Sequence, residues 1–350
     1  MAILNKEGGI AFFLFALVLN RISDVFGIQP QPQAPSVGTR STTLFPILFE
    51  SPRVLVVRKP HGISHHDEAL ASGSESKEGT SESITPGVLR LLRKERQQLA
   101  GKMGERLYGV HRLDKVTSGI LVFAKDATTA SILSEFFAEG KIQKIYFGLS
   151  AKKPKKKKQG LVQGGMTRSR NKSWRLVRKP TNGQKNTTEN FAKTRFFSTG
   201  LNATGIDDAR KTSLTDSIAN VKTVTMFRPY TGKTHQLRVA AKAMGIPLLG
   251  DPIYKDGNAK KSENAVMTTT RTMLHASGIH IPEFLDEAEI NVWCPPTFFF
   301  DCEVGENKDS TNGDHAVRAL LSDALEMAVE KLMMKNCDVH GILETMSLKH

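Results

Sequence analysis

Short apolar runs separated by polar segments dominate the pattern of this chain. Runs of this kind, rich in Val, Ile, Leu and Phe and bounded by turn-forming or charged residues, predict β-strands. We expect strands at residues 54–57, 107–110, 120–124, 144–150, 223–227, 273–276, 279–281, 289–293 and 298–304. Helical spacing of apolar residues predicts helices at 87–98, 127–138, 234–244 and 315–334. Short strands interleaved with few helices indicate an α+β fold.

Composition divides the chain of 350 residues into three parts. We expect a presequence or disordered segment at 1–43, a main domain at 44–305, and an extension at 306–350 that carries the last amphipathic helix. Polar or strongly charged stretches interrupt the main domain, and we interpret them as insertions near residues 70–85, 151–180 and 186–216. A domain of this size can bury a sizeable core.

The first segment has an apolar run at residues 10–19 that is too short to span a bilayer as a helix of about 20 residues. A stretch rich in Pro, Gln, Ser and Thr follows, and it has no acidic residue after Asp24 up to Leu44. This arrangement favours an address to an organelle, a plastid or mitochondrion, over a membrane anchor. A disordered N-terminus without an address is the alternative, and the main domain would then act in the cytoplasm.

The chain carries a formal net charge of +14 with an isoelectric point near 9.6. Such a charge predicts a polyanionic partner, and nucleic acid is the usual one. Between residues 152 and 179 there are twelve Lys or Arg residues and no acid. We expect this stretch to contact RNA phosphates through Lys155, Lys156, Lys157 and Lys158. A solvated loop, or a basic membrane-surface protein, is the rival interpretation.

Few other chemistries fit the sequence. Cys294, Cys302 and Cys337 are scattered without a C-x-x-C pair, so neither a disulfide framework nor a structural zinc site is expected. The Gly-Lys-Thr triplet at 232–234 is not a P-loop, because Phe227 stands where that motif needs glycine. We expect no metal and no cofactor.

The most informative stretch reads HRLDKVTSG, at residues 111–119, and it connects two expected strands. Charged groups on a loop between strands are typical of sites held by a rigid scaffold. The run HRLDKVTSGILVFAKD resembles the central motif of the RluA-type family of RNA pseudouridine synthases. Further blocks match that family in order, namely LVVRKPHG at 55–62, KIY at 144–146, TGKTHQLRV at 231–239, GDPIY at 250–254 and RTMLHA at 271–276. The resemblance covers roughly residues 47–300.

The resemblance implies a bent, mostly antiparallel sheet with helices and loops around a central catalytic cleft. It also implies that specific uridines of rRNA or tRNA become pseudouridine without a cofactor, in a protein that we expect to be monomeric and not membrane-bound. Asp114 matches the catalytic aspartate, Arg238 its arginine partner, and Tyr146 the tyrosine that packs on a uracil flipped out of the RNA. Arg112 matches an RNA contact beside the flipped base, and Leu274 an apolar wall under it.

We expect His111, Lys144 and Lys233, which lie in the same blocks, to contact the RNA as well. Lys233 departs from the family, which usually has Arg there. Lys keeps the charge but lacks the planar fork of donors. If this residue binds a phosphate, Lys can serve; if it makes bidentate contacts, we expect RNA affinity or site choice to differ, and catalysis to be affected less. The alternative function is an inactive RNA-binding protein on the same scaffold. The presence of Asp114, Tyr146 and Arg238 together argues against that alternative.

Overall fold

A computed structural model describes residues 43–69, 84–101, 105–155, 157–169, 173–177, 190–201, 221–255, 271–296 and 322–333. The long strands of its sheet are β1 (Ile47–Glu50), β2 (Val54–Lys59), β6 (Ser118–Ala124), β7 (Gln143–Ser150), β8 (Gln159–Arg168), β9 (Trp174–Val177), β10 (Phe191–Gly200), β11 (Thr223–Pro229), β12 (Leu274–Ile281) and β13 (Ile290–Trp293). Shorter strands are β3 (Glu68–Ala69), β4 (Ile84–Thr85) and β5 (Tyr108–Gly109). The labelled helices are α2 (Val88–Ala100), α3 (Ala127–Glu139) and α6 (Gln236–Ala243).

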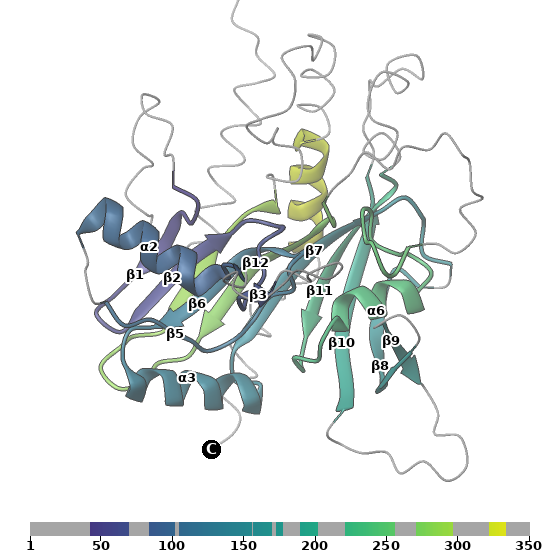
Figure 1. Ribbon diagram of the computed structural model, residues 1–350. Coiled ribbons are helices and arrows are strands. Elements are labelled where there is room, and N and C mark those ends of the chain that lie inside the picture. Colours follow the sequence, from purple (N-terminus) through teal and green to yellow (C-terminus); the bar gives the residue numbers. More distant parts are fainter. Residues whose placement is uncertain are drawn as a thin grey trace, which may run out of the picture. The chain divides into compact units, whose positions relative to one another are not determined.

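One large sheet runs in the order β1-β2-β6-β12-β7-β11-β10-β8-β9, and β5 and β13 pair beside β6 and β12. Its neighbouring strands are antiparallel except for β6 and β12, which are parallel. The expected α+β class and mostly antiparallel sheet are therefore confirmed. Figure 1 shows α3 beside β5 and β6 in one half of the sheet, and α6 beside β9 and β10 in the other.

The first half of the sheet holds the largest apolar core. Strands β2 and β6 are buried on both faces, which explains why their sequences, VLVVRK and SGILVFA, are almost continuously apolar. Helix α2 contributes Val88 and Leu92 to this core, and α3 contributes Leu133. Asp126 caps α3, because its carboxylate accepts the Thr129 backbone N–H at 2.8 Å. Here the expected elements are confirmed to within a few residues.

The second half contains strands that the sequence pattern did not predict. Strands β8 and β9 lie in the segment interpreted as a basic insertion, and β10 lies in the segment interpreted as a polar one. The segments 151–180 and 186–216, which we interpret as insertions, therefore contribute strands to the sheet, which the sequence pattern did not predict. In β10 the buried positions include the polar Thr194 and Ser198 beside Ala192 and Phe196, so its apolar alternation is incomplete.

Smaller differences concern the ends of the chain and β12. The two expected strands at 273–276 and 279–281 form one strand whose register shifts between Ala276 and Gly278. Residues 322–333 are helical within the helix expected at 315–334, and Leu325 and Val329 are buried. The rest of that helix, the expected strand at 298–304 and the N-terminal segment lie outside the described residues. Among the described helices, none has the length and apolar character needed to cross a bilayer.

Candidate active site

Asp114 lies on the loop that joins β5 to β6, in the half of the sheet with the largest core. The loop turns tightly, because the Thr117 N–H donates to the Asp114 carbonyl at 3.0 Å. It ends where β6 meets β12, with Gly119 opposite Ala276. Gly119 has a φ of +111°, and a Cβ there would lie 2.2 Å from the Ala276 carbonyl oxygen. Only glycine fits, and this close approach fixes the position of the loop.

A buried lysine holds the same loop from inside the core. Lys59, at the end of β2, has no exposed surface, and its ammonium donates to the carbonyls of Thr117 at 2.9 Å and Lys115 at 3.4 Å. Its third acceptor is the carbonyl of Pro60 at 2.8 Å. Burial lowers the pKa of Lys59 to about 7, against the opposing attraction of Asp114. Lys59 therefore positions the loop through its backbone.

Arg238 lies on the opposite side of the site, on α6. The first residue of α6, Gln236, fixes the chain there, because its amide oxygen accepts from the Thr231 hydroxyl at 2.7 Å and from the Lys233 N–H at 2.9 Å. Just before the helix, His235 adopts a left-handed conformation with a φ of 57°. Arg238 itself is buried and faces the Asp114 loop.

Two carboxylates share the Arg238 guanidinium. Asp251 accepts from its Nε at 2.7 Å and from its Nη2 at 2.9 Å, whereas Asp114 accepts from Nη1 at 3.2 Å. Burial alone would lower the pKa of Arg238, but Asp251 and Asp114 outweigh it and raise that pKa. Burial likewise opposes the ionisation of Asp251, but Arg238 and the N–H groups of Tyr254 and Ile253 lower its pKa. Both groups are therefore charged near neutral pH.

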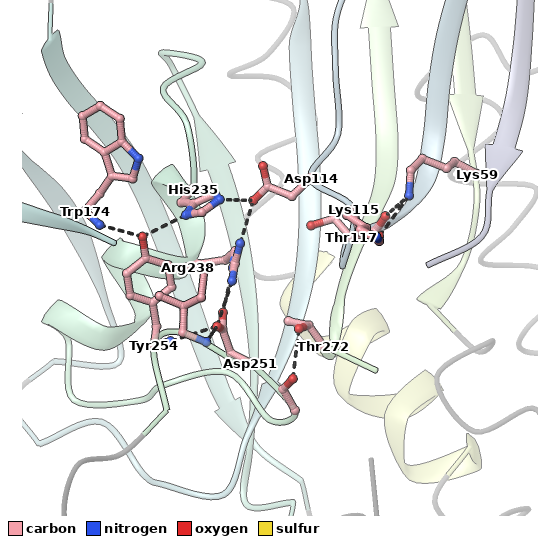
Figure 2. A network of polar contacts seen from close by, with 12 residues as sticks. Lys59, Asp114, Lys115, Thr117, Trp174, His235, Arg238, Asp251, Tyr254 and Thr272 are labelled. Carbon is pink, nitrogen blue, oxygen red and sulfur yellow. Dashed lines mark hydrogen bonds and ion pairs between the residues drawn. The ribbon is translucent and has the colours of Figure 1, made fainter. Parts of the chain in front are cut away.

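A second chain of contacts reaches Asp114 through His235. Figure 2 shows it running from Trp174 through Tyr254 and His235 to Asp114. The backbone N–H of Trp174 donates to the Tyr254 hydroxyl at 2.9 Å, and that hydroxyl lies 2.9 Å from His235 Nδ1. On the other side of the ring, His235 Nε2 lies 4.0 Å from Asp114 Oδ2. Burial lowers the pKa of His235 despite the attraction of Asp114, so the ring is neutral near pH 7.

The Asp114 loop and α6 enclose a pocket of about 380 Å³. Tyr146 from β7 and Leu274 from β12 line it together with Asp114 and Arg238. Burial, and then the charge of Asp114, raise the pKa of Tyr146, so its phenol stays neutral. A neutral ring, an apolar wall and a carboxylate in one cavity can hold a planar base with its sugar against the carboxylate.

The expected RNA-contacting residues line the same pocket with different exposures. Arg112 is exposed and Lys233 is half-buried. Lys144 is buried, with its ammonium 5.5 Å from the centre of the Phe137 ring. His111 stacks on Phe137, its Nε2 accepts the Val122 N–H at 3.0 Å, and burial lowers its pKa to about 3. His111 is thus a neutral residue that fixes the loop to β6.

Some expected residues lie elsewhere, and some residues of the site were not expected. Lys155 and Lys157 line a separate groove, Lys158 is exposed beside it, and Lys156 lies outside the described residues. The sequence analysis gave no role to Lys59, His235, Asp251 or Tyr254. They lie in the blocks KPHG, THQ and GDPIY, which resemble the family, and this was the available indication. No cluster of metal-ligating side chains occurs among the described residues.

The comparisons with known proteins identify the family of this chain. The family model described as "RNA pseudouridylate synthase" matches residues 53–243. An uncharacterized RNA pseudouridine synthase of Haemophilus influenzae is 32% identical over 74% of this chain and 94% of its own length. Ribosomal large subunit pseudouridine synthase C of Rickettsia typhi is 30% identical over 55% of this chain and 54% of its own length.

Solved structures support the fold. Human RNA pseudouridylate synthase domain containing 1 superposes with a TM-score of 0.51 at 20% identity, covering 81% of this chain and 97% of that one. The alternative of an inactive RNA-binding scaffold is not favoured, because the relatives carry the names of synthases. The chain belongs to the RluA-like RNA pseudouridylate synthase family and is an RNA pseudouridine synthase, an isomerase that acts on RNA.

Proposed function

We propose that Asp114 is the catalytic residue and that the pocket around it receives a uridine turned out of the RNA. The observation that carries this proposal is the placement of the Asp114 carboxylate, which lines the cavity beside Tyr146 and Leu274 and is paired with a buried arginine. Extrusion of the nucleotide is required because the reacting atoms are inaccessible within a stacked helix. Stacking on Tyr146 replaces part of the stacking that the base loses.

The reaction breaks the N1–C1′ bond and forms a C5–C1′ bond in the same nucleotide. Uracil leaves with the electron pair of the broken bond, and the sugar becomes electron-poor. Asp114 either bonds to C1′ or removes a proton from the ribose, and both roles require an ionised carboxylate near the sugar. After the base turns, C5 bonds to C1′ as the Asp114–C1′ bond breaks or, in the other route, as the ribose takes its proton back from Asp114. The hydrogen on C5 then leaves as a proton, and N1 takes up a proton.

Arg238 pairs with Asp114 and orients its carboxylate in this scheme. Asp251 occupies two of its donors, so the guanidinium plane is fixed and Nη1 alone is presented to Asp114. The arrangement is pre-organised, because the charges are in place before any substrate binds. His235 adds a neutral neighbour. If the Tyr254 hydroxyl donates to its Nδ1, the ring carries its proton on Nε2, on the side of Asp114.

The experiment that tests this proposal is tritium release from RNA labelled at uridine C5. Asp114→Asn keeps the shape of the side chain and removes its charge, so we expect turnover to fall by at least about 1,000-fold while RNA binding persists. Asp286→Asn, at an exposed aspartate away from the pocket, is the matched control and should release tritium like the wild type. Turnover by Asp114→Asn near that of the control would disprove the role of Asp114.

For the substrate, we propose ribosomal RNA in preference to transfer RNA. Several relatives are named ribosomal large subunit pseudouridine synthases, among them one from Borreliella burgdorferi that is 27% identical over 61% of this chain. Site mapping in rRNA and tRNA from cells with and without the enzyme would separate the two. We expect the enzyme to act as a monomer, which light scattering would test.

For the compartment, we propose an organelle. A relative from Oryza sativa named RNA pseudouridine synthase 2, chloroplastic, is 32% identical over 41% of this chain and 28% of its own length. Together with the composition of residues 1–43, this supports a presequence. Fusing residues 1–43 to a fluorescent protein would test it, and a diffuse cytoplasmic signal would contradict it.

A further inference from the structure

A second groove lies at the other end of α6 from the catalytic pocket. The first turn of α6, with Gln236 and Arg238, lines the catalytic pocket, whereas Lys242 and the residues up to Gly245 line the second groove. The eight residues of α6 separate these ends by about 12 Å at 1.5 Å per residue. The second groove has a volume of about 590 Å³, within the range of sites that bind small organic groups.

Cations surround this groove. Lys155 and Lys157 come from the lysine-rich stretch and Lys242 comes from α6, and none of the described residues that line the groove is acidic. Lys155 runs along Gly245, because a Cβ at Gly245 would lie 3.7 Å from its Cδ. Three ammonium groups without a carboxylate among their lining neighbours make a site for a polyanion.

The floor of the groove is apolar. Leu161 on β8 lines it and is 45% exposed, and the half-buried Met244 lines it as well. Val162 and Phe196 also border it but are buried, each only 6% exposed. Apolar surface beside cations suits a group that is both planar and charged.

The lysine-rich stretch is anchored at both ends rather than extended. The Lys158 carbonyl accepts from the Ser198 N–H at 2.6 Å and from the Ser198 hydroxyl at 2.7 Å. At the other end, the Ser150 hydroxyl accepts the Lys152 N–H at 3.2 Å. These bonds hold Lys155 and Lys157 beside α6, so the cations belong to a built groove. This order reduces the entropy lost when a ligand binds.

We infer that this groove binds a single-stranded RNA segment that flanks the target nucleotide, with phosphates at Lys155, Lys157 and Lys242 and a base against Leu161. The inference rests on the proposed function, in which the target enters the pocket around Asp114. α6 then forms a ridge between the target and its flank, and a strand of a few nucleotides spans it. The lysine-rich stretch thus contributes to the choice of RNA and takes no part in the chemistry.

Binding of oligouridylates provides the test. Lys155→Gln combined with Lys157→Gln should reduce the salt dependence for an oligouridylate of about ten nucleotides, by up to about 0.7 in logarithmic slope for each phosphate contact. Binding of an oligouridylate of about three nucleotides, which occupies the catalytic pocket alone, should not change. The control combines Lys94→Gln on α2 with Lys331→Gln, which removes the same charge at exposed positions. Equal slopes for the two double variants would overturn the inference.

The apolar floor is tested separately by Leu161→Ser. We expect binding of the longer oligouridylate to weaken by about five- to tenfold with its salt slope unchanged, because a base contact and no charge is lost. Leu99→Ser, at an exposed leucine of α2, should have no effect. Binding that Leu161→Ser leaves intact would overturn the base contact, and displacement of the RNA by polyglutamate of equal charge as readily as by RNA would overturn the choice of ligand.

Failure of this inference is distinguishable from failure of the proposed function. The groove variants are judged by the binding of oligouridylates alone, whereas Asp114→Asn is judged by tritium release. If Asp114 has no catalytic role, Asp114→Asn keeps its turnover whatever the groove variants do. If the groove does not bind RNA, the salt slopes of the groove variant and its control coincide, while Asp114→Asn remains inactive.

Discussion

The two walls of the catalytic pocket hold their charged groups by different means. On the α6 wall, Arg238 has a carboxylate of its own, Asp251, which is itself held by two backbone N–H groups. On the wall from β6, the loop that carries Asp114 is held by Lys59, whose ammonium has three carbonyl acceptors and no carboxylate in contact among the described residues. The α6 wall is therefore stabilised by the Arg238–Asp251 ion pair, whereas the loop wall is held by the single buried ammonium of Lys59.

The difference matters because an ion pair and an unpaired charge respond differently to pH and to mutation. Within a buried pair each charge stabilises the ionised form of the other, as the pKa directions of Arg238 and Asp251 show. A buried ammonium without a carboxylate in contact lacks that stabilisation, and the pKa of Lys59 falls to about 7. The α6 wall should therefore be insensitive to pH near neutrality, whereas the loop wall should not.

The largest effect is expected when the ion pair is broken. Asp251→Asn removes the charge that balances the buried Arg238, so we expect stability to fall by about 3–5 kcal/mol. It also frees the guanidinium to turn toward Asp114, which should lower turnover per folded molecule by at least about tenfold. Urea unfolding gives the first quantity, and tritium release normalised to folded protein gives the second.

Glu105→Gln is the matched control for that variant. Arg96 is buried between Glu105 and Glu50, none of which is among the residues lining the pocket, so its pair is broken without touching α6. We expect Glu105→Gln to lose stability while keeping its turnover per folded molecule. Equal turnover losses in both variants would mean that Asp251 acts only through stability, and the contrast between the walls would lose its functional meaning.

A smaller effect is expected when the pH is raised. The folded pKa of Lys59, about 7, lies below its value in an unfolded chain, about 10.4, so the unfolded state binds more protons between these limits. This group therefore makes stability rise with pH from about 7 to about 10, by up to about 1.4 kcal/mol per pH unit. Below pH 7 the ammonium is protonated in both states and adds no pH dependence.

Urea unfolding across this pH range would measure that rise in wild type and in Lys59→Met. The variant has no ammonium at this position, so its profile should lack the contribution. Lys94→Met, at an exposed lysine of α2, should keep the wild-type profile and serves as the control. Parallel profiles for wild type and Lys59→Met would show that the loop wall does not carry the perturbed charge.

The same contrast between regions explains what could be predicted from sequence. Strands β2 and β6 are buried on both faces, so continuous apolar runs marked them. Strands β8 and β10 are defined by pairing with each other and with β11 across long sequence separations. Among the buried positions of β8, Gly164 stands between Val162 and Met166, and among those of β10, Thr194 stands between Ala192 and Phe196. The apolar alternation is therefore interrupted and gives only a weak local signal.

The residues of the candidate site also fall into two groups, those that the sequence indicated and those that it did not. The resemblance located Asp114, Arg238, Tyr146 and Leu274, and the structure places all four in one pocket. The partners that set their charge and orientation could not be inferred, because the Arg238–Asp251 and Lys59–Thr117 contacts depend on tertiary geometry. A carboxylate in GDPIY or a lysine before a proline has no local feature that shows what it will contact. Family blocks mark such residues without giving their roles.

The smallest effect is expected at Lys233, where this chain differs from the usual arginine of the family it resembles. Lys233 lines the pocket on the α6 side, and its backbone N–H is already used by Gln236. Lys233→Arg supplies a fork of donors to an RNA phosphate without changing the charge, so we expect KM to fall by about threefold at most, under about 1 kcal/mol. The turnover number should not change, because neither Asp114 nor Arg238 moves. Lys193→Arg, on neighbouring β10 but not among the residues lining the pocket, is the control. A changed turnover number in Lys233→Arg alone would place this side chain next to the reacting nucleotide and make the α6 wall part of the chemistry beyond Arg238.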